Sequence, residues 1–171
     1  NFGVSTPTTE LTKQVIDVSR PNVSFEQMTL DVYNSRVYLA GKHTWEPVAL
    51  NLREDVNNNV QKLVGEQLQK QFDFFEQSSA ASGLDYKFVT RIEILDGGNG
   101  IHTPNILETF EIYGCYLESA NYNTLAYSAG TEPVTVTLAV RYDNAVQTPQ
   151  GTGIGTAIGR TVNTLVTGAG A

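Results

Sequence analysis

The fold is decided by the stretch VTVTLAVRY at residues 134–142, in which apolar side chains alternate with small or polar ones without a break. Successive side chains of a β-strand point to opposite faces of a sheet, so the apolar positions of this stretch share one face. The stretch therefore predicts a strand with one buried face.

Other segments show the same period of two. In residues 86–95, Phe88, Ile92 and Ile94 point one way, whereas Arg91 and Glu93 point the other way. Further strands are expected over residues 14–19, 23–40, 45–52 and 106–117. The turn signal Asn34-Ser35 splits the second of these into a hairpin, and the total is six or seven strands.

One segment has a helical period instead. Apolar residues recur every three or four positions, which predicts a helix over about residues 57–78 with one apolar stripe. The stripe consists of Val60, Leu63, Val64, Leu68, Phe72 and Phe75. Asp55 or one of Asn57, Asn58 and Asn59 is expected to cap the start of the helix, and Ser82-Gly83 is expected to end the segment.

These elements predict a mainly-β domain with one α-helix, an antiparallel sandwich or barrel with the helix packed across it. We expect a single domain over residues 1–147. Residues 148–171 are rich in Gly and Thr and read as a C-terminal tail.

Composition excludes several classes of protein. The 171 residues contain 11 Lys and Arg against 18 Asp and Glu, a net charge of −7, which argues against gripping a nucleic-acid backbone. The one cysteine permits no internal disulfide. No run of about 18 apolar residues is present, so the sequence predicts no membrane-spanning helix.

No catalytic constellation is recognisable. His43 and His102 lack partners at metal-ligand spacing, and Cys115 is expected to be a small buried residue within a strand. Residues 151–159 are glycine-rich, but their spacing does not match a phosphate-binding loop. Glu108 and Glu111 fall on opposite faces of one strand and cannot act together as acid and base. We expect no enzyme activity, no cofactor and no metal.

The sequence of residues 20–55, RPNVSFEQMTLDVYNSRVYLAGKHTWEPVALNLRED, resembles the tail tube proteins of contractile-tailed bacteriophages of the T-even type. The shared order is a strand, a proline loop, a long hairpin ending near Ala-Gly, a strand and a helix. YKF at 86–88, YGCY at 113–116 and LAVRYD at 138–143, taken as the last strand, extend the resemblance to about residues 14–147. The tail is longer than in that family and the front is shorter, so we expect a missing N-terminal segment.

The resemblance, which includes the Hcp tubes of type VI secretion, implies a structural virion protein. Such subunits form hexameric rings whose inner sheets join into one barrel, and the rings stack into a tail tube. The tube conducts DNA into the host during genome ejection. The implied partners are further copies of the chain, the sheath, the baseplate and the tail terminator. DNA would be bound only in transit and non-specifically, and no stable membrane binding is implied. The implied location is the virion tail, assembled in the host cytoplasm.

Two sets of candidate site residues are named, the first from matched chain order and the second from the acidic charge balance. The segment at about residues 20–35 is expected to be a ring-stacking loop. Its candidate residues are Arg20, Pro21, Phe25, Met28, Tyr33 and Asn34. Residues 1–13 and the tail are expected to make further contacts. Acids on strands are hypothesised to face the lumen and repel DNA, although some must lie on the other face. The candidates are Asp17, Glu93, Glu108 and Glu111.

Three alternatives remain open from the sequence. The chain could be a tube initiator or terminator, or the tube of a phage-derived contractile injection system. It could instead be a monomeric β-sandwich that binds a ligand through the aromatic loop with Tyr122 and Tyr127. A hydrolase is a further class, but the sequence offers no catalytic residues to name.

Overall fold

A computed structural model describes residues 11–98, 104–126, 130 and 133–148 of the chain. Strands dominate this part of the chain, as predicted, and the helices are few and short. The elements in order are η1 (Leu11–Gln14), β1 (Val15–Val18), β2 (Val23–Val32), β3 (Ser35–Trp45), β4 (Val48–Arg53), α1 (Asn59–Gln71), β5 (Phe72–Asp73), β6 (Ser78–Ser79), α2 (Gly83–Tyr86), β7 (Phe88–Leu95), β8 (Ile106–Asn121), β9 (Thr135–Arg141) and β10 (Asn144–Thr148).

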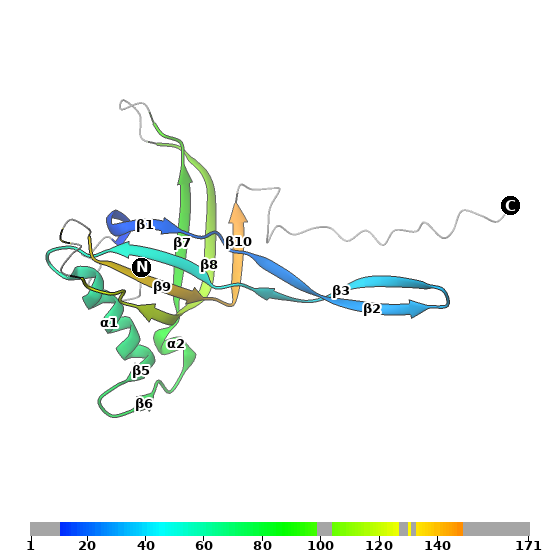
Figure 1. Cartoon of the computed structure of the whole chain (residues 1–171), viewed down its shortest axis with the longest axis horizontal. Helices are drawn as coiled ribbons and strands as arrows, with labels where there is room; N and C mark the ends of the chain where they lie inside the picture. Colours follow the sequence, from blue (N-terminus) through cyan, green and yellow to red (C-terminus); the bar gives the residue numbers. More distant parts are fainter. Residues whose placement is uncertain (1–10, 99–103, 127–129, 131–132, 149–171) are drawn as a thin grey trace.

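A curled antiparallel sheet forms the body of the protein (Figure 1). Its strand order is β1-β4-β9-β8-β10, and β7 pairs with β8 as well. The long strand β8 belongs to both halves of the sheet. Its residues 106–115 pair with β7 and β10, whereas residues 116–121 pair with β9. The sheet therefore bends around β8 into a half-barrel, which confirms the predicted antiparallel barrel-like fold.

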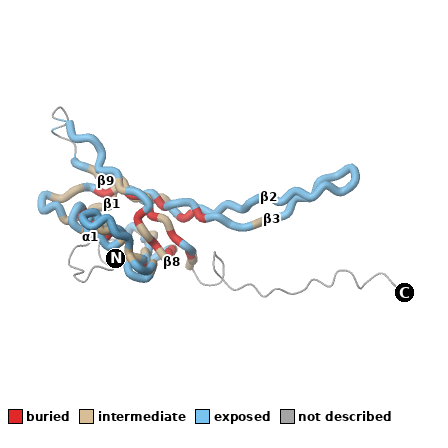
Figure 2. Tube along the Cα trace, turned by 90° about the horizontal axis from the view of Figure 1, so that it is seen from below, coloured by how far each residue is buried: buried red, intermediate tan, exposed pale blue. Residues whose placement is uncertain are grey.

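The core lies between the two halves of the sheet and α1. The alternation over residues 134–142 is confirmed, because Val136, Leu138 and Val140 are buried. Val60 and Val64 of α1 are also fully buried in the same cluster. Figure 2 shows the buried residues gathered in the body, where the strands cross.

Strands β2 and β3 form a separate two-stranded hairpin that projects far from the body (Figures 1 and 2). Every residue of β2 is exposed, and along β3 only Gly41 and Trp45 are not. Trp45 is buried at the base, where its ring lies 5.6 Å from that of Tyr142. The hairpin is thus anchored in the core at one end and free along its length.

Helix α1 is shorter than predicted. It ends at Gln71, and the chain enters the small β5–β6 hairpin instead of continuing to residue 78. The carboxylate of Asp73 accepts hydrogen bonds from the backbone N–H groups of Phe75 and Glu76, a turn that competes with helical bonding. Phe75 is consequently 95% exposed rather than part of a buried stripe.

The predicted caps also differ. Asn58 holds the N-cap position in a left-handed conformation, but its side chain makes no capping hydrogen bond. The carboxylate of Asp55 accepts from the N–H of Val56 and from the side chain of Asn59, in the turn before the helix. Ser82 does not end a helix; it begins α2 in a capping box with Asp85.

Several strand boundaries shift. Because α2 occupies residues 83–86, the strand expected over residues 86–95 starts at Phe88. Strand β8 continues past residue 117 to Asn121, and the hairpin turn is Tyr33-Asn34 rather than Asn34-Ser35. The stretch at 138–143 is not the last strand, because β10 follows it and pairs with β8. The short sequence NAVQT has no distinctive periodicity. The strand is held by pairing with β8 and by Ala145, which is buried in the core.

Candidate assembly surfaces

Two of the chemical groups singled out in the sequence, Cys115 and His43, lie within the described residues, and neither belongs to a cluster of reactive side chains there. Burial raises the pKa of the Cys115 thiol above its usual range, so the thiol stays protonated and is a poor nucleophile. His43 lies on β3 between the rings of Phe25 and Trp45, with centroids 6.3 and 6.1 Å away. His102 and the glycine-rich residues 151–159 lie outside the described residues.

Within the described ranges, no cluster of three or more His, Cys, Asp or Glu side chains could hold a metal ion. Over the same ranges, no helix has the length and apolar character needed to cross a bilayer. The most exposed surface of the described residues is that of the β2–β3 hairpin.

The two faces of this hairpin differ in chemistry. Met28 lies opposite Leu39 and Leu30 lies opposite Val37, and cross-strand partners in an antiparallel pair share a face. This apolar face is 44–54% exposed at each position, and no described element covers it. We call it the apolar arm face. It consists of Met28, Leu30, Val32, Val37 and Leu39.

The opposite face of the hairpin is polar. Thr29 lies opposite Tyr38, and Asp31 lies opposite Arg36, whose Nε is 2.9 Å from the Asp31 carboxylate. The tip is a two-residue turn in which Tyr33 is fully exposed with a φ of 50°. A two-residue turn fixes the register of the strands, so the apolar arm face has one defined composition.

A bulge interrupts the pairing of β2 and β3 near the base of the hairpin. The register of pairing shifts between Phe25 and Gln27, where Gly41 and Lys42 lie opposite the single residue Glu26. A Cβ atom on Gly41 would lie 2.9 Å from the backbone oxygen of Glu26, so the close approach requires glycine. Bulges bend a strand and increase its twist.

The residues predicted for a ring-stacking loop lie along this hairpin and its root, and the segment is a β-hairpin rather than a loop. Pro21 is buried at the root next to exposed Arg20. Phe25 lies below the bulge, whereas Met28 belongs to the apolar arm face. Tyr33 and Asn34 form the tip.

The four acids proposed for a lumen do not gather at one place. Glu93 and Glu111 lie on the outward face of the β7–β8 pair, where Glu93 is 2.9 Å from Arg91 Nε and Glu111 accepts from the Tyr113 hydroxyl at 2.6 Å. Glu108 lies on the opposite face, paired across the strands with Ile94, and its carboxylate accepts a hydrogen bond from Gln147.

The fourth acid, Asp17, lies in the other half of the sheet. It is on β1, where its carboxylate accepts from the Asn51 side chain at 2.7 Å. The structure thus brings together two of the four acids, Glu93 and Glu111, with one arginine beside them. The alternation of Glu108 and Glu111 inferred from sequence agrees with the observed register.

The sheet offers open edges in addition to the hairpin. In the described part of the chain, β7 and β10 each pair only with β8, and β1 pairs only with β4. Strand edges present unpaired N–H and C=O groups that can pair with another chain.

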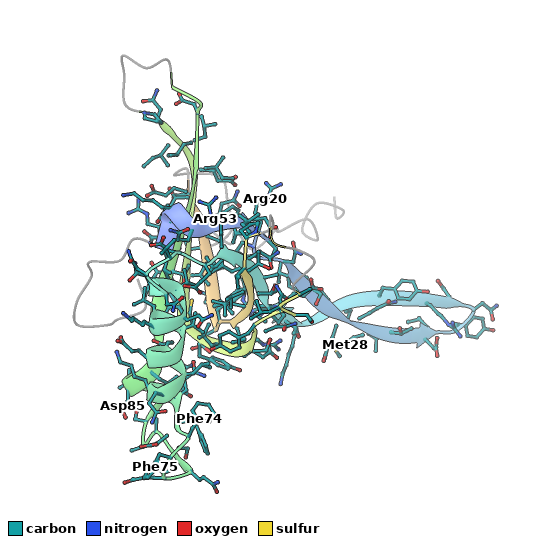
Figure 3. All side chains as sticks on the ribbon, turned by 60° about the vertical axis from the view of Figure 1, so that its left-hand side comes forward. Arg20, Met28, Arg53, Phe74, Phe75 and Asp85 are labelled. Atoms are coloured by element: carbon teal, nitrogen blue, oxygen red, sulfur yellow. The ribbon has the colours of Figure 1, made fainter. Side chains whose placement is uncertain are left out.

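The turn after α1 is a surface that sequence reasoning missed. Phe74 and Phe75 project at the far end of this helix (Figure 3), and Phe72 meets Phe74 edge to face at 5.4 Å. The helical spacing of Phe72 and Phe75 concealed the turn. The signal for the turn in the sequence was Asp73, because an aspartate side chain can bind nearby backbone N–H groups and so compete with the helix. Its carboxylate accepts from the N–H groups of Phe75 and Glu76 in this way.

No protein-family model matches the chain, and no curated protein sequence matches it. Solved structures do match. A chain of the sheath–tube complex of an extracellular contractile injection system, PVC, in its extended state aligns with a TM-score of 0.57 and 11% identity. That match covers 78% of this chain and 80% of the other.

Two further structures are similar. The anti-feeding prophage cap, a tube-terminating cap, gives a TM-score of 0.57 at 9% identity over 86% of this chain and 95% of its own. An Hcp protein gives 0.50 at 11% identity over 78% and 68%. The chain therefore has the Hcp-like fold that the sequence resemblance implied.

Proposed function

We propose that this protein is a structural subunit of a contractile tail or injection apparatus, and that its copies join into rings that stack into a tube. The observation that carries the proposal is the apolar arm face, which projects from the body with no described element to cover it. The fold shared with a cap, an Hcp protein and a chain of a sheath–tube complex supports it.

The energetics of the arm favour contact with a neighbour. A two-stranded hairpin is marginally stable alone in water, and this one keeps half of each apolar side chain exposed. Covering the remaining half of these side chains is worth roughly 1 kcal/mol each. A second copy in an adjacent ring would supply that cover, in keeping with the ring-stacking role expected for this segment.

The open strands favour closure into rings. Strands β7 and β10 flank one half of the sheet, on either side of β8. Joining the edge of one copy to the edge of the next extends the sheet and removes its unpaired edges when the ring closes. Six copies per ring is the number that the family resemblance implies.

The finer proposal is that the tube belongs to a phage tail and carries DNA in transit. Its partners would be the sheath around it, the baseplate at one end and the terminator at the other. The virion would be assembled in the host cytoplasm. The outward face with Glu93 and Glu111 is our candidate for the lumen surface. Its local balance of two acids to one arginine is weakly acidic. Such a face would repel DNA without binding it.

A terminating cap is the second candidate. The match to the anti-feeding prophage cap spans 95% of that chain, so this structural relative has little outside the shared fold. A cap would bind one end of a tube instead of polymerising. The length of the assembled particle separates these two functions.

The experiment is negative-stain microscopy of the purified chain, with sedimentation velocity over a wide range of concentration. Stacked rings or tubes support a tube subunit, and single rings support a cap. A chain that stays monomeric throughout contradicts both and favours the binding-module alternative, of whose loop Tyr122 is half-exposed and Tyr127 lies outside the described residues.

A further inference from the structure

Met28 is the single methionine of the chain, and it belongs to the apolar arm face. It is paired across the hairpin with Leu39, and it is 54% exposed. Figure 3 shows Met28 on the projecting hairpin, away from the core of the body. The thioether is thus part of an apolar contact surface and is also open to small molecules in solution.

The other readily oxidised side chains of the protein are shielded. Cys115, the single cysteine, is fully buried, and its thiol donates to the Ile112 carbonyl at 3.3 Å. Burial raises the pKa of this thiol, so the reactive thiolate is scarce at neutral pH. Trp45, the single tryptophan, is buried with its ring against that of Tyr142. Met28 is therefore the side chain that a dissolved oxidant reaches first.

Oxidation of Met28 changes the chemistry of the arm. Methionine sulfoxide is polar, and its oxygen accepts hydrogen bonds from water. The other four members of the apolar arm face have no polar side-chain atoms to donate to it; they are Leu30, Val32, Val37 and Leu39. A neighbouring molecule that covers this face would bury the sulfoxide oxygen away from water, and burying an unpaired polar group is unfavourable.

We propose that Met28 is a modification site, at which oxidation by hydrogen peroxide keeps the subunit from stacking into a tube. The sulfur lone pair attacks one peroxide oxygen, an S–O bond forms as the O–O bond breaks, and the other oxygen leaves as water after proton transfer. The sulfur loses two electrons, and the peroxide gains them. The site is open in the free subunit and covered in the tube. The inference rests on the proposed stacking through the apolar arm face.

The first measurement locates the reaction. The full chain is treated with dilute hydrogen peroxide before and after assembly, and mass spectrometry of its peptides follows the addition of one oxygen atom at Met28. In the free subunit, Met28 should react about as fast as a methionine in an unstructured peptide, because no described element covers it. In tubes it should react several-fold more slowly, since the adjacent ring then excludes the oxidant.

The second measurement follows assembly. The oxidised chain should need about tenfold more protein than the untreated chain for half-maximal assembly in sedimentation velocity. Methionine sulfoxide reductases for both sulfoxide epimers, supplied with a dithiol, should restore assembly. The dithiol gives two electrons and becomes a disulfide, and the sulfoxide oxygen leaves as water. The melting temperature of the unassembled chain should not change on oxidation, because Met28 lies outside the core.

The matched control moves the thioether to the other face of the hairpin. The double variant Met28→Leu and Tyr38→Met carries its one methionine on the polar face, where Tyr38 is 61% exposed. Peroxide should oxidise that methionine as readily, yet leave the assembly of the variant as it was before treatment. Each chain is compared with its own untreated sample, so any effect of the substitutions themselves cancels.

Each result decides the question. Loss of assembly on oxidation of Met28, its return on reduction and unchanged assembly of the double variant support the modification site. Normal assembly of the oxidised chain overturns it and leaves the proposed function intact. Equal loss in the double variant, or slow oxidation of Met28 in the free subunit, has the same consequence. An untreated chain that never assembles overturns the proposed function, and this inference with it.

Discussion

Gly114 lies directly against the carboxylate of Asp143, at the corner where β8 passes from one half of the sheet to the other. A Cβ atom at position 114 would be 2.1 Å from Asp143 Oδ2, and the backbone of Gly114 has a φ of +68°. The N–H of Asp143 donates to the Tyr113 carbonyl at 3.0 Å, which holds the two segments together. The corner of the half-barrel therefore requires glycine for a steric and a conformational reason.

We expect Gly114→Ala to lower the free energy of unfolding by roughly 1–3 kcal/mol, because the added methyl group both strains the backbone and displaces Asp143. Chemical denaturation followed by circular dichroism measures the change. The control is Gly65→Ala in α1, where an added Cβ meets nothing within 4 Å. It should stabilise the protein by about 0.5–1 kcal/mol. Equal stability of the two variants would contradict this account of the corner.

Lys87 completes the same corner, with its Nζ 2.6 Å from Asp143 Oδ2. This hydrogen bond to Asp143 raises the pKa of Lys87 above its ordinary 10.5. A raised folded-state pKa contributes stability that is fully present below pH 10.5 and is lost as the pH rises above it. Since Asp143 is largely exposed, the contribution is at most about 1 kcal/mol.

The stability difference between the original chain and Lys87→Met should therefore vanish as the pH rises past 10.5. Urea unfolding at pH 8 and at successively higher values measures it. A difference that is constant over this range would show that the ion pair does not act through the charge of Lys87. Raising the salt concentration at pH 8 should shrink the same difference, since exposed pairs are screened.

The side chain of Gln71 makes the two backbone hydrogen bonds at Leu117 that a neighbouring β-strand would otherwise make. Its side-chain amide donates to the Leu117 carbonyl at 2.9 Å and accepts from the Leu117 N–H at 2.8 Å. We expect Gln71→Glu to lower the free energy of unfolding by about 1–3 kcal/mol. The reason is that a carboxylate cannot donate a hydrogen bond and leaves the carbonyl of Leu117 without its partner. Gln61→Glu, on the exposed side of α1, is the control for the added charge and should change stability far less. Thermal melts of the three chains decide it.

The sequence predicted those elements whose period follows from a buried face. Val136 and Leu138 alternate with polar neighbours because one side of β9 faces the core, and Val60 and Val64 repeat at helical spacing for the same reason. Phe72 and Phe75 continue the helical pattern of steps of three or four residues, but the local hydrogen bonds of Asp73 form a turn there instead. Local hydrogen bonding of this kind leaves no periodic signal.

The assembly surfaces were only partly predictable. The hairpin was recognised from its alternation and turn. However, apolar residues such as Leu30 and Val37 give the same sequence pattern whether they face the core of the protein or a neighbouring molecule. The corner at Gly114 was invisible, because its partner Asp143 is distant in sequence. The lumen acids were proposed from charge and strand position. The alternation of Glu108 and Glu111 was evident from the sequence, but the register of β7 and β8 was needed to place Glu93 on the same face as Glu111.

The apolar arm face provides the sharpest test of the proposed ring stacking. Val37 and Tyr38 are neighbours on β3 that point to opposite faces of the hairpin, and both are exposed. If an adjacent ring covers the apolar face, Val37→Ser should weaken stacking by about tenfold in protein concentration, whereas Tyr38→Ser should alter it little. Tube length and the ratio of rings to tubes in negative stain measure the effect.

The same pair of variants distinguishes stacking from folding. Both side chains lie outside the core, so neither change should alter the free energy of unfolding of the unassembled chain by more than about 0.5 kcal/mol, the usual effect of a surface substitution. Normal tubes from Val37→Ser, or equal loss of tubes from both variants, would show that the apolar arm face does not form the contact between rings. Loss confined to Val37→Ser assigns the contact to that face, because the two residues are neighbours on one strand and lie on opposite faces of the hairpin.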